Sequence, residues 1–89
     1  MQHILITYDL CYPGQQYQQV YEAIKRFGLC VKITESAFLL KTNSSCVDIR
    51  NSLNACTDKN DKIFVCKLTG EAAWRNLITS DDSVKVMLT

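Results

Sequence analysis

The stretch Gln2-His3-Ile4-Leu5-Ile6-Thr7-Tyr8-Asp9-Leu10 lies almost at the N-terminus and decides the fold of this chain. Its β-branched and apolar residues favour a β-strand. The strand brings a single carboxylate, that of Asp9, to its C-terminal end. A turn containing Pro13 and Gly14 follows at once and leads into a helical pattern. The chain therefore begins with a strand, a turn and a helix, and Asp9 marks the end of the strand.

The rest of the chain alternates between strands and helices. The expected elements are a helix over about 15–27, strands over 29–33 and 36–41, a helix over about 46–56 and a strand over 62–68. Gly28 is a good stop for the first helix, and Ser44 or Ser45 is a suitable N-cap for the second. The order βαββαβ is that of the split-βαβ arrangement. We therefore predict an α+β, ferredoxin-like fold in one domain, 1–89, with a four-stranded antiparallel sheet and two helices on one face.

Beyond this unit, the sequence predicts a short helix over 71–78 and a last, short strand within 83–88. The open face of the sheet raises a separate question, because neither 2–10 nor 62–68 has a cleanly polar side. A solvated antiparallel face normally carries polar side chains. We therefore expect this face to be at least partly covered, most simply by a second copy of the chain. The run 84–88 could then add an edge strand to the partner.

Composition excludes several classes of protein. The chain has 89 residues, 47% of them hydrophobic, and a formal net charge of +1, so a global basic field of the kind that attracts nucleic acid is absent. No signal peptide and no apolar run of membrane-spanning length is apparent, so we expect a cytoplasmic protein without a membrane partner. The cysteines form no C-x-x-C pair and are predicted to be reduced core residues: Cys11, Cys30, Cys46, Cys56 and Cys66.

On these residues the chain resembles the small CRISPR-associated ferredoxin-like dimers of the Cas-two type, and more closely their stand-alone SinR-like and VapD-like relatives. The resemblance spans most of the chain. It is carried by Ile4-Leu5-Ile6-Thr7-Tyr8-Asp9-Leu10, Ile24-Lys25-Arg26-Phe27-Gly28, Thr34-Glu35-Ser36-Ala37-Phe38-Leu39-Leu40 and Leu68-Thr69-Gly70-Glu71-Ala72-Ala73-Trp74. The strand ending Tyr8-Asp9 is the sharpest of these motifs.

The resemblance implies a homodimer associated with nucleic acid. In CRISPR members the dimer bridges two copies of an integrase along duplex DNA, and some members are described as metal-dependent nucleases. In those nucleases the aspartates that end the first strand of both subunits surround one metal ion, and Asp9 is the matching position here. CRISPR members commonly carry arginines soon after this aspartate, where this chain has residues 11–16, Cys-Tyr-Pro-Gly-Gln-Gln. This departure favours a stand-alone role over CRISPR adaptation.

The residues themselves leave two interpretations of Asp9 open. Mg²⁺ or Mn²⁺ needs only one or two carboxylates when phosphate oxygens complete the shell, so one aspartate from each subunit could hold it. Alternatively, Asp9 braces the following turn, as aspartate often does. In an enzyme, Tyr8, Ser36 and Phe38 would shape the site around this catalytic and metal-binding aspartate. His3 is the only histidine and is more typical of a surface position.

Basic residues near the end of the first helix offer a second candidate surface. Lys25, Arg26 and Lys32 could line a ridge that binds a nucleic-acid backbone, or the first two could simply complement the helix dipole. Tyr12 could stack on bases beside them. Tyr17 and Trp74 are expected to be packing residues.

Two functions follow from this pattern. The first is a nucleic-acid-associated homodimer that acts on RNA or DNA. If this homodimer is an enzyme, we expect a metal-dependent endoribonuclease in a toxin, mobile-element or defence context. The alternative is a non-catalytic scaffold or regulatory dimer that binds a protein partner through its sheet edge or its C-terminal strand.

Overall fold

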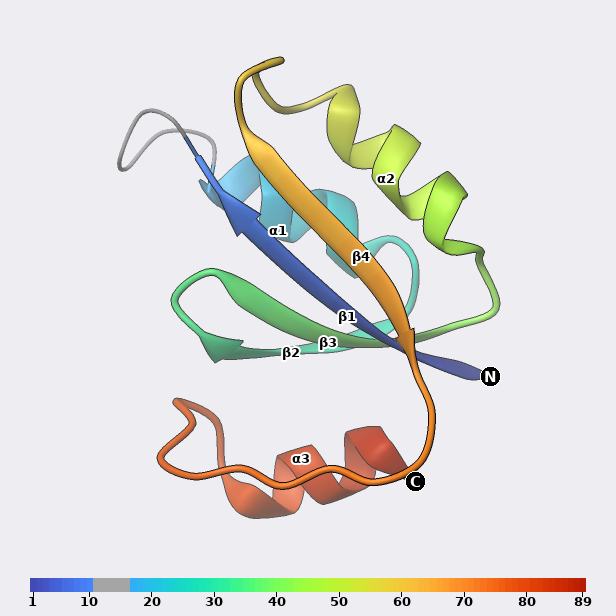
Figure 1. The fold of residues 1–89 in the computed structure, drawn as a ribbon, viewed down its shortest axis with the longest axis vertical. Coiled ribbons are helices and arrows are strands. Elements are labelled where there is room, and N and C mark those ends of the chain that lie inside the picture. The colour runs from blue at the N-terminus through green and yellow to red at the C-terminus, as the bar shows by residue number, and fades with distance from the viewer. Residues whose placement is uncertain (11–16) are drawn as a thin grey trace.

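A computed structural model describes residues 1–10 and 17–89 and has the predicted α+β architecture (Figure 1). The elements follow the order β1 (Gln2–Asp9), α1 (Tyr17–Lys25), β2 (Leu29–Thr34), β3 (Ala37–Thr42), α2 (Cys46–Asn54), β4 (Lys62–Leu68) and α3 (Asp81–Leu88). The strands form one sheet in the order β2-β3-β1-β4. Each neighbouring pair is antiparallel, which confirms the ferredoxin-like prediction.

Strand β1 is a central strand that pairs with β3 on one side and β4 on the other. Its side chains alternate between the two faces of the sheet, as the pleat requires. Ile4, Ile6 and Tyr8 are buried in one core, which α1 and α2 cover. Leu5 packs against a second core on the opposite face. Both faces of β1 are therefore used, which explains why its sequence has no polar side.

The first core is closed by two helices whose ends match the sequence signals. Helix α2 begins after Ser45, whose hydroxyl oxygen accepts a hydrogen bond from the Asp48 backbone N–H at 3.1 Å. This bond satisfies one of the free N–H groups in the first turn of the helix. Ile49 and Leu53 from α2 are fully buried against the sheet. The predicted N-cap of this helix is therefore confirmed at Ser45.

The predicted C-terminal strand is wrong, because Asp81–Leu88 forms helix α3. Ser80 caps this helix by accepting a hydrogen bond from the Ser83 N–H, and Asp81 and Asp82 lie in its first turn, where carboxylates stabilise the helix dipole. Val84 and Met87 lie one helical turn apart and are both buried. The alternating Val-Lys-Val pattern is typical of a strand, but Val84 and Met87 can both enter the same core only in a helix, because residues three apart point to opposite faces of a strand.

Helix α3 covers the β2 and β3 half of the second sheet face (Figure 1). Val84 and Met87 pack with Leu39 in a core that also includes Trp74 and Leu77. The expectation that a second copy covers this face is therefore wrong for this half, because the chain covers it with its own helix. The existence of a homodimer is a separate question and stays a prediction.

The predicted helix over 71–78 is also wrong, although its composition favours a helix. Asn76 has a φ of 58°, a left-handed conformation that interrupts any helix, and Gly70 before the segment has a φ of 86°. The Ile78 N–H donates to the Ile33 carbonyl of β2 at 3.1 Å. The Trp74 indole N–H donates to the Asp81 carboxylate at 3.1 Å. The segment is thus an irregular arm that runs beside β2, and Trp74 is a packing residue as predicted.

Gly28 lies between α1 and β2, and a steric constraint at this position is stricter than the need to end the helix. Its φ is 152°, and a Cβ at this position would overlap the backbone carbonyl oxygen of Lys41 in β3. Only glycine therefore allows the chain to enter β2 at this distance from β3.

No helix among the described residues is both long and apolar enough to cross a membrane.

We expect Met87→Ala to lower the free energy of unfolding by about 2–5 kcal/mol, because it removes buried side-chain volume between α3 and the sheet. Met87 is 2% exposed, whereas Val86 on the same helix is 56% exposed. Val86→Ala is therefore the matched control and should change stability by no more than about 0.5 kcal/mol. Urea unfolding followed by circular dichroism measures both. Equal, small effects would mean that α3 contributes little to the second core.

Candidate functional site

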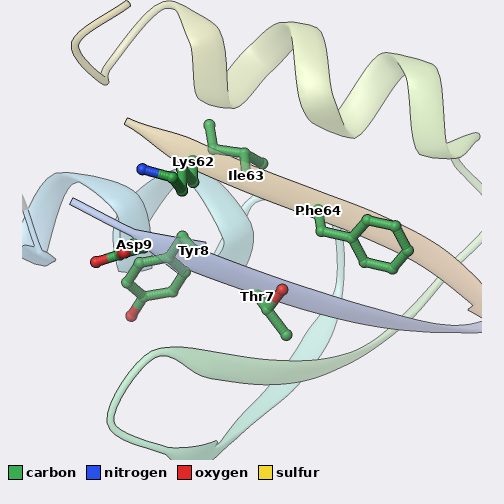
Figure 2. Close-up of a pocket in the computed structure, with 6 residues that line it drawn as sticks. All are labelled: Thr7, Tyr8, Asp9, Lys62, Ile63 and Phe64. Atoms are coloured by element: carbon green, nitrogen blue, oxygen red, sulfur yellow. The ribbon is translucent and has the colours of Figure 1, made fainter. Parts of the chain in front are cut away.

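Asp9 lies at the C-terminal end of β1, where its side chain is exposed on the rim of a shallow pocket. The pocket has a volume of about 180 Å³. The residues that line it come from the paired ends of β1 and β4: Thr7, Tyr8, Asp9, Lys62, Ile63 and Phe64 (Figure 2). It lies on the part of the sheet that α3 leaves open. The candidate catalytic residue is thus exposed to solvent.

The register of the sheet places Lys62 directly opposite Asp9. Directly opposed residues of an antiparallel pair point to the same face, and Figure 2 shows both side chains at the same end of the pocket. No hydrogen bond or ion pair joins Asp9 to another described residue. The two side chains therefore lie on the same face of the sheet without being bonded to each other, and each is exposed to solvent.

Two further side chains line this face beside the charged pair. Phe64 is 61% exposed, which is unusual for a phenylalanine in a strand, and Thr7 is its direct partner on β1. Because α3 packs on β2 and β3, nothing among the described residues covers the Phe64 ring. The site combines a carboxylate, an ammonium group, a hydroxyl and an aromatic ring on one open surface.

Tyr8, Ser36 and Phe38 come together, but mainly on the other side of the sheet. Tyr8 and Phe38 are buried in the first core, with ring centroids 6.2 Å apart. The Tyr8 N–H donates to the Ser36 carbonyl at 3.0 Å. This bond ties the β2–β3 turn to the end of β1. These residues therefore position the strand that carries Asp9, and the Phe38 side chain lies on the face opposite the Asp9 carboxylate.

The three basic candidates are exposed but do not form one ridge. Lys25 lies over the Tyr21 ring, 5.1 Å from its centroid, and close enough to Cys30 to influence its thiol. Lys32 lies on the same face of the sheet as Cys30. Arg26 instead lines a groove between α1 and α2, together with Glu22. Lys25 and Lys32 thus share one side of the molecule, and Arg26 belongs to another.

These cations are also separated from Asp9 along the sheet. Leu29, at the start of β2, pairs with Lys41, which in turn pairs with His3 near the start of β1. Helix α1 therefore ends near the start of β1, whereas Asp9 lies at its end (Figure 1). Within one copy of the chain, Lys62 is the cation that accompanies Asp9. Finding it from sequence would have required the pairing register of β1 and β4.

The remaining candidates have different positions. Tyr12 lies outside the described residues, as does the turn that Asp9 was expected to brace. Tyr17 is the first residue of α1. His3 is partly buried, and its Nε2 atom has no hydrogen-bond partner. No group of three or more His, Cys, Asp or Glu side chains within 1–10 and 17–89 is placed to hold a metal ion.

Four of the cysteines are described, and all four are unpaired and partly buried: Cys30, Cys46, Cys56 and Cys66. Burial raises the pKa of the Cys30 thiol above its ordinary value, and the nearby Lys25 charge lowers it by a smaller amount. Burial likewise raises the pKa of Cys56. A raised pKa makes a thiol a poor nucleophile at neutral pH, so these two residues are packing groups as predicted.

Comparison with known proteins does not assign this chain to a family. No protein-family model matches the chain, and a search of curated proteins finds no match. The site must therefore be interpreted from its own geometry.

The raised thiol pKa of Cys30 predicts a pH dependence of stability. The pKa of this thiol is higher in the folded protein than in the unfolded chain. Its contribution to stability is therefore fully present below the unfolded-state pKa, and it is lost as the pH rises through the folded-state pKa. Urea unfolding between about pH 7 and pH 10.5 should show a larger loss for the wild type than for Cys30→Ala, which cannot titrate there. Parallel losses in the two proteins would contradict a buried, protonated Cys30.

Proposed function

We propose that this chain is a nucleic-acid-associated protein of the stand-alone Cas-two-like type, which hydrolyses phosphodiester bonds of RNA with a divalent metal ion held by Asp9. One observation supports the proposal above the others. Asp9, whose side chain is exposed, pairs directly with Lys62 across the sheet, and both residues line one pocket. A carboxylate can hold a metal ion, and a neighbouring ammonium group can contact the phosphate that the ion also binds.

The donor set of one chain suits a loosely held Mg²⁺ or Mn²⁺ ion. Asp9 supplies one carboxylate, and the Thr7 hydroxyl lies on the same face of β1. Mg²⁺ often keeps several waters and takes only one or two protein carboxylates together with substrate phosphates. When bound, such an ion would polarise the phosphodiester and activate a water molecule. The single carboxylate explains why we propose a homodimer, in which a two-fold axis brings the two copies of Asp9 together.

The other residues of the pocket would orient the substrate. Lys62 would bind a phosphate oxygen beside Asp9 and offset the negative charge that gathers there. Phe64 presents an exposed ring on the same face and would pack against a base or sugar. Tyr8 is fixed in the core by its contact with Phe38 and would keep the end of β1 rigid. A rigid strand end holds the Asp9 carboxylate in place without reorganisation.

The first prediction concerns catalysis by Asp9. Labelled RNA and duplex DNA should show cleavage of RNA in Mg²⁺ or Mn²⁺ and none in chelator, and Asp9→Asn should reduce the rate by at least about 100-fold, as expected for loss of a metal ligand. Glu71→Gln, a substitution of an exposed carboxylate far along the chain, is the matched control and should retain full activity. No cleavage, or equal cleavage by wild type and Asp9→Asn, would exclude this mechanism and leave a binding or scaffold role.

A second prediction concerns Lys62 and is measured as binding in chelator, so that it does not depend on cleavage. Lys62→Gln should weaken RNA binding and reduce the slope of the log binding constant against log salt concentration by about 1. Lys85→Gln on α3 is the matched control, because Lys85 is also exposed but lies away from the pocket. Fluorescence anisotropy at several salt concentrations gives the slopes. If both variants give the same slope as the wild type, Lys62 does not contact phosphate.

A further inference from the structure

The two edges of the sheet differ in how they are protected. At the β2 edge, the arm before α3 donates a backbone hydrogen bond from Ile78 to Ile33. At the β4 edge, the strand Lys62–Leu68 pairs only with β1. Its outward-facing backbone N–H and C=O groups have no partner within the described residues. A seven-residue edge of this kind is a template for another extended chain.

Beside the β4 edge lies a groove that helix α2 borders. It has a volume of about 270 Å³, and its lining is Cys46, Val47, Arg50, Ile63, Phe64 and Val65. Ile63 and Val65 pack partly into the first core, whereas Val47 is 55% exposed on the surface of α2. Figure 1 shows α2 running alongside β4. An edge strand beside a helix with an apolar groove between them is the arrangement that binds peptides by strand addition.

The charges of this surface are mainly positive. Lys62 and Lys67 are exposed on β4, one on each face of the sheet, and Arg50 reaches the groove from α2. The nearest acidic residue before the strand, Asp61, is already engaged, because its carboxylate accepts a hydrogen bond from the Asp58 N–H at 2.8 Å. An extended segment that added here would meet basic side chains on both of its faces.

We propose that the β4 edge and the adjoining groove bind an extended, acidic segment of a partner protein, which adds to the sheet as a fifth strand. Its apolar side chains would occupy the groove beside Val47 and Ile63, and a carboxylate would face Arg50. The proposal goes beyond hydrolysis at Asp9, because it requires no metal ion.

A second copy of the chain is the less suitable occupant of this edge. Strand β4 carries a lysine near each end, Lys62 and Lys67, so two paired copies of β4 would gather four ammonium groups along one junction. Lysines on an edge also generally prevent self-association. The same lysines attract a segment of opposite charge. Charge complementarity therefore favours an acidic partner.

The test uses a fluorescein-labelled nonapeptide in which pairs of glutamates alternate with pairs of valines, so that each face of the extended peptide carries both residue types. It is titrated with the full chain and followed by anisotropy. We expect saturable binding. A peptide with lysine in place of glutamate should not bind. The acidic peptide should also fail to bind when it is N-methylated at alternate residues, because methylation removes the backbone N–H donors that face β4. Arg50→Glu should weaken binding by about tenfold or more, because it places a like charge beside the peptide carboxylate.

Val47→Glu tests the groove, and Val86→Glu is its matched control. Both valines are exposed on helix surfaces, at 55% and 56%, so neither substitution threatens the fold. Val47→Glu should weaken binding of the acidic peptide by about tenfold or more, and Val86→Glu should leave it unchanged. Any of three results would overturn the proposal. The acidic peptide could show no binding at a millimolar concentration of the chain, the lysine or N-methylated peptide could bind equally well, or the two valine variants could have equal effects. So would a dimer, seen by sedimentation velocity, that Val47→Glu dissociates, because a second copy would then occupy the edge.

Discussion

The structure depends on the double pairing of β1 at the centre of the sheet. Strand β1 aligns β3 and β4 directly, because they bond to its two edges, and β2 is aligned through β3. Its even-numbered residues Ile4 and Ile6 enter the core under α1 and α2, and Leu5 enters the core under α3. A shift of one residue in its register would exchange these two sets of side chains. The position of Asp9 at the end of β1 is fixed by the same pairing.

The second core determines which part of the sheet remains accessible. Helix α3 packs on β2 and β3, and the arm before it bonds to β2, so the chain covers one half of this face with its own C-terminal segment. The half near β4 remains open, and Phe64, Lys62 and Asp9 are found there. The candidate catalytic surface is thus open because a single eight-residue helix covers only the β2 and β3 half of this face, whereas the β4 edge is unpaired because β4 is the last strand of the sheet.

Charge is distributed over this open region in a way that the net value of +1 conceals. Lys62 and Lys67 lie along β4, and Arg50 lies on the helix beside it, whereas Lys25 and Lys32 lie near β2 at the opposite edge of the sheet. Two anionic partners fit this pattern at neighbouring places. A phosphodiester would meet Lys62 beside Asp9 on the face of the sheet, and an acidic peptide would meet the edge of β4. The two proposals can be separated experimentally, since only the first requires a metal ion.

The sequence by itself determined the elements whose patterns are local. The periodicities of β1, α1, α2 and β4, together with the Ser45 cap, were sufficient to predict the βαββαβ order and thus the sheet. Asp9 could be selected as a candidate because it ends the first strand. The segment 71–88 could not be assigned in this way. Residues 71–78 have the composition of a helix but form an irregular arm, and residues 83–88 have the alternating pattern of a strand but lie in helix α3.

Only the tertiary structure decided these features, because they depend on contacts between segments distant in the sequence. The left-handed Asn76 and the Ile78–Ile33 bond turn 71–78 into an arm beside β2, and burial of Met87 makes the terminal segment a helix. Likewise, Lys62 became a candidate only when the pairing of β4 with β1 placed it opposite Asp9. Strand register is a long-range property, so no local pattern in the chain specifies which cation accompanies the carboxylate.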